Sequence, residues 1–169
     1  MEADAEGWTV LIIAIDPGPT QSAVVQYDRN GVVVEHCISE NDTVLSTLAR
    51  YVSGAHDTLV IEQIAGMGMA VGAEVFETCF WSGRFAQAWG RPFERIKRLP
   101  VKLHLCGQAR AKDANVRQAL IDRFGGPDCI RKGGALYKVK GDEWAALAVA
   151  VTWADLHPHG TGGAGPNST

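Results

Sequence analysis

Three acidic residues stand at the ends of strongly apolar stretches of this sequence: Asp16, Glu62 and Asp142. Carboxylates that lie close together repel one another unless they are protonated or neutralised by a cation. Hard divalent cations such as Mg²⁺ or Mn²⁺ provide that neutralisation through oxygen ligands. A pair of such ions can activate a water molecule and stabilise the leaving oxygen of a phosphodiester. If the fold gathers these three side chains, the sequence predicts a metal-dependent nuclease site.

Two of the acids also have an ordinary structural interpretation. Asp16 precedes Pro17 and Gly18, and these residue types commonly close a strand with a turn. Asp142 opens an apolar helical segment, where a carboxylate caps free backbone amides and suits the helix dipole. The catalytic interpretation therefore depends on whether the surrounding elements bring the three residues together.

The first part of the chain predicts a sheet that places Asp16 and Glu62 at one edge. The Asn30-Gly31 turn favours an antiparallel arrangement of the first strands. Three such strands are expected, at residues 9–15, 21–27 and 32–38. A helix that begins at Ser39 or Asn41 and ends near residue 53 leads to a buried strand at 58–62. A strand reached through a helical crossover is normally parallel to its neighbour, so Glu62 and Asp16 should lie at the same end of adjacent strands.

The second part of the chain alternates helices, loops and one further strand. The expected elements are a glycine- and methionine-rich loop at 65–72, a helix at 73–89, a strand at 93–98, a short turn or helix at 100–105, a helix at 111–124, a loop at 127–140 and a helix at 142–157. The 73–89 helix is apolar almost all round, which indicates burial on two sides. Its second side meets either the chain's own core or the partner in a homodimer.

Composition predicts one globular domain at residues 9–157, between a flexible N-terminus at 1–8 and a disordered tail at 158–169. Apolar residues make up 46% and charged residues 21%, as in ordinary globular proteins. No apolar run is long enough for a transmembrane helix, and the acidic N-terminus does not have the pattern of a signal peptide. The four widely spaced cysteines favour free thiols in a reducing compartment. We therefore expect a cytoplasmic protein with no membrane contact.

Basic residues gather in one part of the chain. Residues 91–140 hold 13 of the 16 Lys and Arg but only four of the 19 Asp and Glu. Such an asymmetry favours a polyanionic partner such as nucleic acid, although a solvated basic face would give the same count. A basic surface beside the acids would hold a phosphate backbone near the metal site.

The order of these motifs resembles the RuvC-type family of Holliday junction resolvases. The resemblance rests on the strand followed by Asp16-Pro17-Gly18, on Val60-Ile61-Glu62-Gln63, and on Asp142 before the apolar run 146–150. It covers roughly residues 10–157. The segments 71–78 (VGAEVFET) and 107–113 (GQARAKD) are most similar to the phage-encoded branch of the family.

This resemblance implies an α/β, RNase H-like fold with a mixed five-stranded sheet flanked by helices, in which the first three strands are antiparallel and the later ones parallel. It also implies a homodimeric endonuclease, dependent on Mg²⁺ or Mn²⁺, that cuts four-way or other branched DNA at two symmetric positions in recombination and repair. Asp16, Glu62 and Asp142 would be its catalytic, metal-binding acids. Its expected location is the cytoplasm of a bacterium or of a phage-infected host.

One position departs from the family pattern. The cellular enzymes carry a fourth acid three residues after the position of Asp142, where this chain has Ala145. Alanine cannot bind a metal ion, so either Glu143 or Asp113 substitutes, or one metal site is weakened. The alternative function is therefore a branched-DNA-binding protein with weakened or lost cleavage. An ATP-using enzyme of the actin and sugar-kinase type also begins with a strand followed by Asp and Gly, but it needs a second nucleotide-binding half.

Several residues are candidates for contact with DNA. The basic candidates for the phosphate backbone are Lys97, Lys102, Arg110, Lys112, Lys132, Lys138 and Lys140. Among them, Lys112 and Lys140 could stabilise charge at the scissile phosphate. Tyr137 or Phe76 could stack on an unpaired base, although we expect Phe76 to pack in the core.

Overall fold

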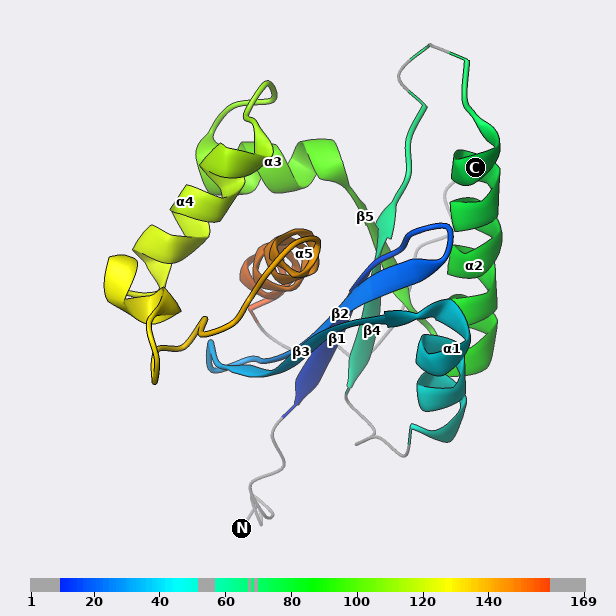
Figure 1. Cartoon of the computed structure of the whole chain (residues 1–169), viewed down its shortest axis with the longest axis horizontal. Coiled ribbons are helices and arrows are strands. Elements are labelled where there is room, and N and C mark those ends of the chain that lie inside the picture. The colour runs from blue at the N-terminus through cyan, green and yellow to red at the C-terminus, as the bar shows by residue number, and fades with distance from the viewer. Residues whose placement is uncertain (1–9, 52–56, 67, 69, 159–169) are drawn as a thin grey trace, which may run out of the picture.

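The fold was analysed in a computed structural model that describes residues 10–51, 57–66, 68 and 70–158. The expected flexible N-terminus at 1–8 and almost all of the expected disordered tail lie outside these residues. The expected end of the first helix, near residue 53, also lies outside them. The described chain forms one five-stranded sheet with helices on both faces (Figure 1).

The sheet has the strand order β3-β2-β1-β4-β5. Its strands are β1 (Leu11–Asp16), β2 (Gln21–Asp28), β3 (Val33–Glu40), β4 (Thr58–Gln63) and β5 (Glu94–Lys97). β1 pairs with β2, and β2 with β3, in antiparallel fashion. β4 runs parallel to both β1 and β5. The predicted mixed sheet, antiparallel first and then parallel, is confirmed.

Strand alternation decides which face of the sheet each acid occupies. Successive side chains of a strand point to opposite faces. Ile12 and Ala14 of β1 pack in the cluster that includes the last helix, whereas Ile13 and Ile15 pack in the cluster on the other face. Asp16 continues the first series. In β4, Val60 packs in the cluster of the last helix, and Glu62 continues that series.

Helices form one layer on each face of the sheet. α1 (Asn41–Arg50) and α2 (Ala73–Trp89) contact each other and cover one face. On the other face α5 (Glu143–Leu156) lies against β1, β2 and β4, and α3 (Arg98–Cys106) and α4 (Asp113–Arg123) pack on α5 (Figure 1). A short 3₁₀ helix, η1 (Pro127–Ile130), precedes the loop that leads into α5. No described helix is long and apolar enough to cross a bilayer.

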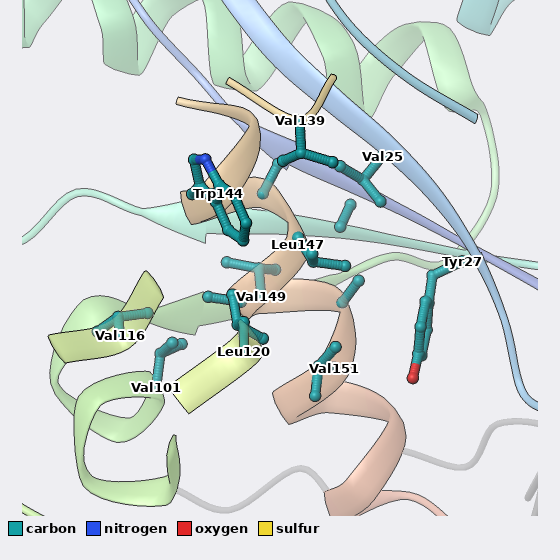
Figure 2. Packing of buried hydrophobic residues seen from close by; sticks show 14 of the residues in the cluster. Val25, Tyr27, Val101, Val116, Leu120, Val139, Trp144, Leu147, Val149 and Val151 are labelled. Atoms are coloured by element: carbon teal, nitrogen blue, oxygen red, sulfur yellow. The ribbon is translucent and has the colours of Figure 1, made fainter. Parts of the chain in front are cut away.

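The larger core lies between the sheet and α5. Figure 2 shows Leu147, Val149 and Val151 of α5 among side chains from β2 and from the neighbouring helices, including Val25 and Leu120. Leu147 and Val151 are fully buried, and so are most of the alanines of α5. Small side chains let the helix lie close to the strands, because nothing larger separates the two backbones. This packing fixes the start of α5, where Asp142 stands.

Two regions differ from the sequence-based expectation. The strand expected at 93–98 is β5, which ends at Lys97, and the short turn or helix expected at 100–105 is a nine-residue helix, α3, that begins at Arg98 directly after β5. The expectation that Phe76 packs in the core is wrong, because Phe76 is 65% exposed and Phe80 is 60% exposed on α2. The helix buries Phe85 and Trp89 against the sheet, and among the described residues none covers Phe76 and Phe80 on its other side.

Candidate active site

Asp16 and Glu62 lie side by side at the carboxyl ends of neighbouring parallel strands. β1 and β4 are in register up to the pair Ile15 and Ile61, and the two acids follow that pair. In open α/β sheets this edge is where ligands bind. The parallel pairing and the shared face therefore bring two predicted site residues together, as the sequence predicts.

The two carboxyl groups are hydrogen-bonded to each other. Burial, together with the negative charges of Glu62 and Asp142, raises the pKa of Asp16 to about 8, while Arg98 acts in the opposite direction. Glu62 is itself only 8% exposed. Two carboxylates in contact cannot both ionise easily, so a proton on Asp16 holds the pair together when no cation is present.

Asp142 stands immediately before α5, whose first turn faces the same side of the sheet. Its charge acts on Asp16, so the structure brings the third predicted acid near the pair. The expected capping role is not seen: the residue has helical backbone angles and its side chain makes no capping hydrogen bond. The exposed Asp142 carboxylate can therefore turn toward a ligand without uncapping the helix.

The three acids fit a hard divalent cation in their donor chemistry, although they do not yet form a closed site. Within the described residues, no three His, Cys, Asp or Glu side chains are arranged to hold a metal ion as they stand. The pKa of Asp16 is raised first by burial and then by the negative charges of Glu62 and Asp142, and those charges favour a cation at this edge. A cation would replace the proton between Asp16 and Glu62 and would draw in Asp142.

Arg98 is a site residue that sequence reasoning missed. Its Nη1 donates to Oε1 of Glu62 at 3.1 Å, and its Nη2 donates to Oδ1 of Asp113 at 2.6 Å. The sequence assigned this residue to the end of a strand, among 13 basic residues of the same window. Its one distinguishing signal was its position directly after β5. Glu62 pairs with Ile96 of β5, so a residue that closely follows Ile96 lies near Glu62.

The two candidate substitute acids occupy different surroundings. Asp113, at the start of α4, is bound by Arg98, whose hydrogen bond holds the pKa of Asp113 below its ordinary value. Glu143 is 2% exposed. Its Oε2 accepts from the backbone N–H of Lys140 at 2.7 Å and lies 3.1 Å from Nδ1 of His36 on β3. Asp113 is therefore linked to Glu62 through Arg98, whereas the carboxylate of Glu143 contacts His36 of β3.

The predicted basic residues divide into two groups. Lys102 of α3 lines a small pocket together with Glu62, Arg98 and Ala145, so it lies at the site. The first group stands around the starts of α3 and α4, and it contains Lys97, Lys102, Arg110 and Lys112. The second group lies on the exposed loop that leads into α5, and it contains Lys132, Lys138 and Lys140.

The second basic group includes a residue with an unusual backbone conformation. Lys138 is the one non-glycine residue in the described part of the chain with a positive φ, at 67°. Such a conformation is uncommon outside glycine and asparagine. The neighbouring Leu136 and Val139 are buried and anchor the loop. The ring of Tyr137 is 39% exposed, and the Lys138 ammonium lies 5.4 Å from its centroid, so one predicted stacking residue is accessible.

Comparison with known proteins identifies the architecture. No protein-family model and no curated protein matches this sequence. Among solved structures, RuvC of Thermus thermophilus is similar, with a TM-score of 0.61 and 16% identity over 85% of this chain and 92% of that one. The chain has the RNase H-like fold.

A second solved structure matches this RNase H-like domain almost equally well. It is T. thermophilus RuvC in complex with a Holliday junction substrate, with a TM-score of 0.59, 16% identity and the same coverage of both chains. At this identity the likeness concerns the fold.

Proposed function

We propose that this chain is a divalent-metal-dependent endonuclease that hydrolyses phosphodiester bonds in four-way or other branched DNA. The observation that carries the proposal is the hydrogen-bonded carboxyl pair of Asp16 and Glu62, with Asp142 close enough to raise the pKa of Asp16. A buried acid pair at a sheet edge is costly unless it serves a ligand. The similarity to a protein solved with a Holliday junction supports branched DNA as the substrate class.

The residues of the site divide the work. Asp16, Glu62 and Asp142 would hold Mg²⁺ or Mn²⁺, which would activate water and stabilise charge on the phosphate. Arg98 orients Glu62 through its hydrogen bond. Lys102, in the same pocket, binds the phosphate backbone next to the scissile bond, and Lys112 and Lys140 stabilise developing charge on the phosphate from the neighbouring loops.

Symmetric cutting requires two sites, and α2 supports a homodimer. Phe76 and Phe80 are largely exposed on one side of this helix, and aromatic side chains on a surface are typical of interfaces. A two-fold dimer through α2 would supply two copies of the acid pair to one junction. Membership of the phage-encoded branch and a cytoplasmic location remain predictions.

The test is cleavage of a labelled four-way junction by wild type and by Asp16→Asn in Mg²⁺. Asparagine keeps the shape of the side chain and removes its charge. Wild type should cut opposing strands at related positions, while Asp16→Asn should bind the junction and leave it intact. Equal cutting by both proteins would contradict the proposal, and a linear duplex of the same sequence controls for unselective cleavage.

A second candidate function is binding of branched DNA without cleavage. Ala145 favours it, because this residue lines the pocket beside Glu62 and offers no ligand atom. It predicts a gel shift with the junction and no cutting in Mg²⁺ or Mn²⁺. A large gain in cutting by Ala145→Asp would show that the missing acid limits activity.

A further inference from the structure

Glu62 has an acid on one side and a cation on the other. Its carboxyl group is hydrogen-bonded to Asp16 at the end of β1. The same group accepts from Nη1 of Arg98 at 3.1 Å. The Glu62 carboxylate therefore faces another acid on the Asp16 side, where no positive charge balances it. On the other side the guanidinium of Arg98 already supplies a positive charge.

The pocket on the Arg98 side offers little to a metal ion. Its polar lining is Glu62, Arg98 and Lys102, and Ala145 closes it from α5. Glu62 is the one carboxylate among the described residues that line it. A divalent cation placed there would meet two cationic side chains and a single acidic ligand. Hard divalent ions need several oxygen ligands, so this pocket is unsuited to one.

Arg98 is fixed in this place by covalent and electrostatic constraints. It is the first residue of α3 and directly follows β5, whose Ile96 pairs with Glu62. Its second arm is bound to Asp113 at 2.6 Å. Partial burial acts to lower the pKa of Arg98, but the hydrogen bonds and charges of Asp113 and Glu62 outweigh it and raise the pKa. The guanidinium is permanently charged.

We propose that Arg98 is a positioning residue that fills the far side of Glu62 with a permanent positive charge, so that the site takes one divalent ion and not two. The proposal rests on the proposed metal-dependent function. The single ion lies on the Asp16 side, and Arg98 takes the place of a second ion as the charge that neutralises Glu62.

The proposal predicts that Arg98 lowers the affinity of the site for its ion. A fixed positive charge next to a ligand carboxylate repels an incoming cation and competes for the same oxygen. Arg98→Gln removes that charge, so the site should bind Mn²⁺ about tenfold more tightly. Arg98→Lys keeps the charge and loses the two-armed geometry, so its affinity should stay close to that of wild type.

The experiment counts Mn²⁺ ions bound by the full chain, by electron paramagnetic resonance of free Mn²⁺ and by calorimetry. Wild type should bind one ion at the site. Asp113→Asn breaks the other arm of Arg98 and is the matched control, with affinity unchanged within about twofold. The double variant Ala145→Asp with Arg98→Gln supplies a carboxylate where the charge was, and it should bind a second ion.

The outcomes separate this proposal from the proposed function. Two ions in wild type, no ion in wild type, or an unchanged affinity in Arg98→Gln would overturn it. If Arg98→Gln fails to fold, as judged by circular dichroism, the ion count of wild type and the affinity of Arg98→Lys still decide. If wild type binds one ion but does not cleave the junction, the proposed nuclease is refuted and the proposed role of Arg98 stands. If wild type binds two ions and cleaves the junction, the nuclease stands and the role of Arg98 is refuted.

Discussion

Asp16 and Glu62 follow the paired residues Ile15 and Ile61 on adjacent parallel strands, and their carboxyl groups are hydrogen-bonded. This contact forms because both side chains belong to the face of the sheet that α5 covers. Burial and the neighbouring acids hold a proton on Asp16 up to a pH of about 8. The three acids therefore favour a bound cation. Without one, ionisation of Asp16 lowers the stability of the folded protein.

The first prediction concerns stability and pH. The folded state raises the pKa of Asp16 from 3.8 to about 8, so between these values the folded protein binds more protons than the unfolded one. Stability must then fall as the pH rises through this window and level off above it. Asp16→Asn removes the titration and should be more stable than wild type near pH 8, by about 2 kcal/mol.

Chemical unfolding of both proteins in the absence of divalent ions measures this difference. It should shrink toward zero below about pH 3, where Asp16 is protonated in both states. Groups remote from Asp16 titrate equally in the two proteins, so their contributions cancel in the difference. A difference that does not change with pH would show that Asp16 is not buried beside charged acids.

The second prediction concerns the proton that a metal ion displaces. Metal ligands must be deprotonated before they bind, so binding releases protons wherever the free ligand is protonated. Near pH 7 Mn²⁺ should release about one proton, and its affinity should rise about tenfold for each pH unit up to about 8. Calorimetry in two buffers of different ionisation enthalpy measures the release. No release at pH 7 would place the ion elsewhere.

Sequence patterns were sufficient for the sheet and for the placement of the three acids near one another, while their role in metal binding stays a prediction. The apolar strands, the Asn30-Gly31 turn and the helical crossover fix the strand order around β1, because each depends on local sequence. The parallel pairing of β1 and β4 then places Asp16 beside Glu62 without further information. The position of Asp142 follows from the apolar sequence of α5, which has to pack against the same face.

Arg98 and the exposed side of α2 could not be foreseen in the same way. The role of Arg98 depends on where β5 ends and α3 begins, and element boundaries are weakly encoded. Its contacts with Glu62 and Asp113 join residues that are 36 and 15 positions away. For Phe76, hydrophobicity alone cannot distinguish a core position from an interface, because both remove the ring from water.

The third prediction separates Glu143 from the metal site. Its carboxylate is bound to the backbone of Lys140 and lies near His36. Glu143→Ala should lower the free energy of unfolding by about 1 kcal/mol, because it leaves the partly buried backbone N–H of Lys140 without this acceptor. Glu143→Gln should change the affinity for Mn²⁺ by less than about threefold. A much larger loss of affinity would make Glu143 a metal ligand, as the sequence allowed.

The fourth prediction concerns the proposed dimer through α2. Replacing Phe80 by Ser removes an exposed aromatic ring, so the monomer should keep its stability within about 0.5 kcal/mol. The dissociation constant of the Phe80→Ser dimer should be at least about tenfold higher than that of the wild-type dimer. Analytical ultracentrifugation across a concentration series measures this, with Leu156→Ser, an exposed apolar residue on α5, as the matched control. A wild-type chain that stays monomeric at high concentration would exclude the interface.

Single-turnover cleavage of a four-way junction, labelled on each strand, in Mg²⁺ decides whether the three acids form a nuclease site. Wild type, Glu62→Gln, Asp142→Asn and Lys132→Gln are compared at protein concentrations that saturate binding. We predict paired cuts in opposing strands by wild type and a loss of at least about a thousandfold in rate for each acid variant. Lys132→Gln should cut at a rate close to that of wild type once the junction is saturated. Acid variants that cut as fast as wild type, or a wild type that binds Mg²⁺ and the junction and cuts nothing, would exclude the proposed nuclease.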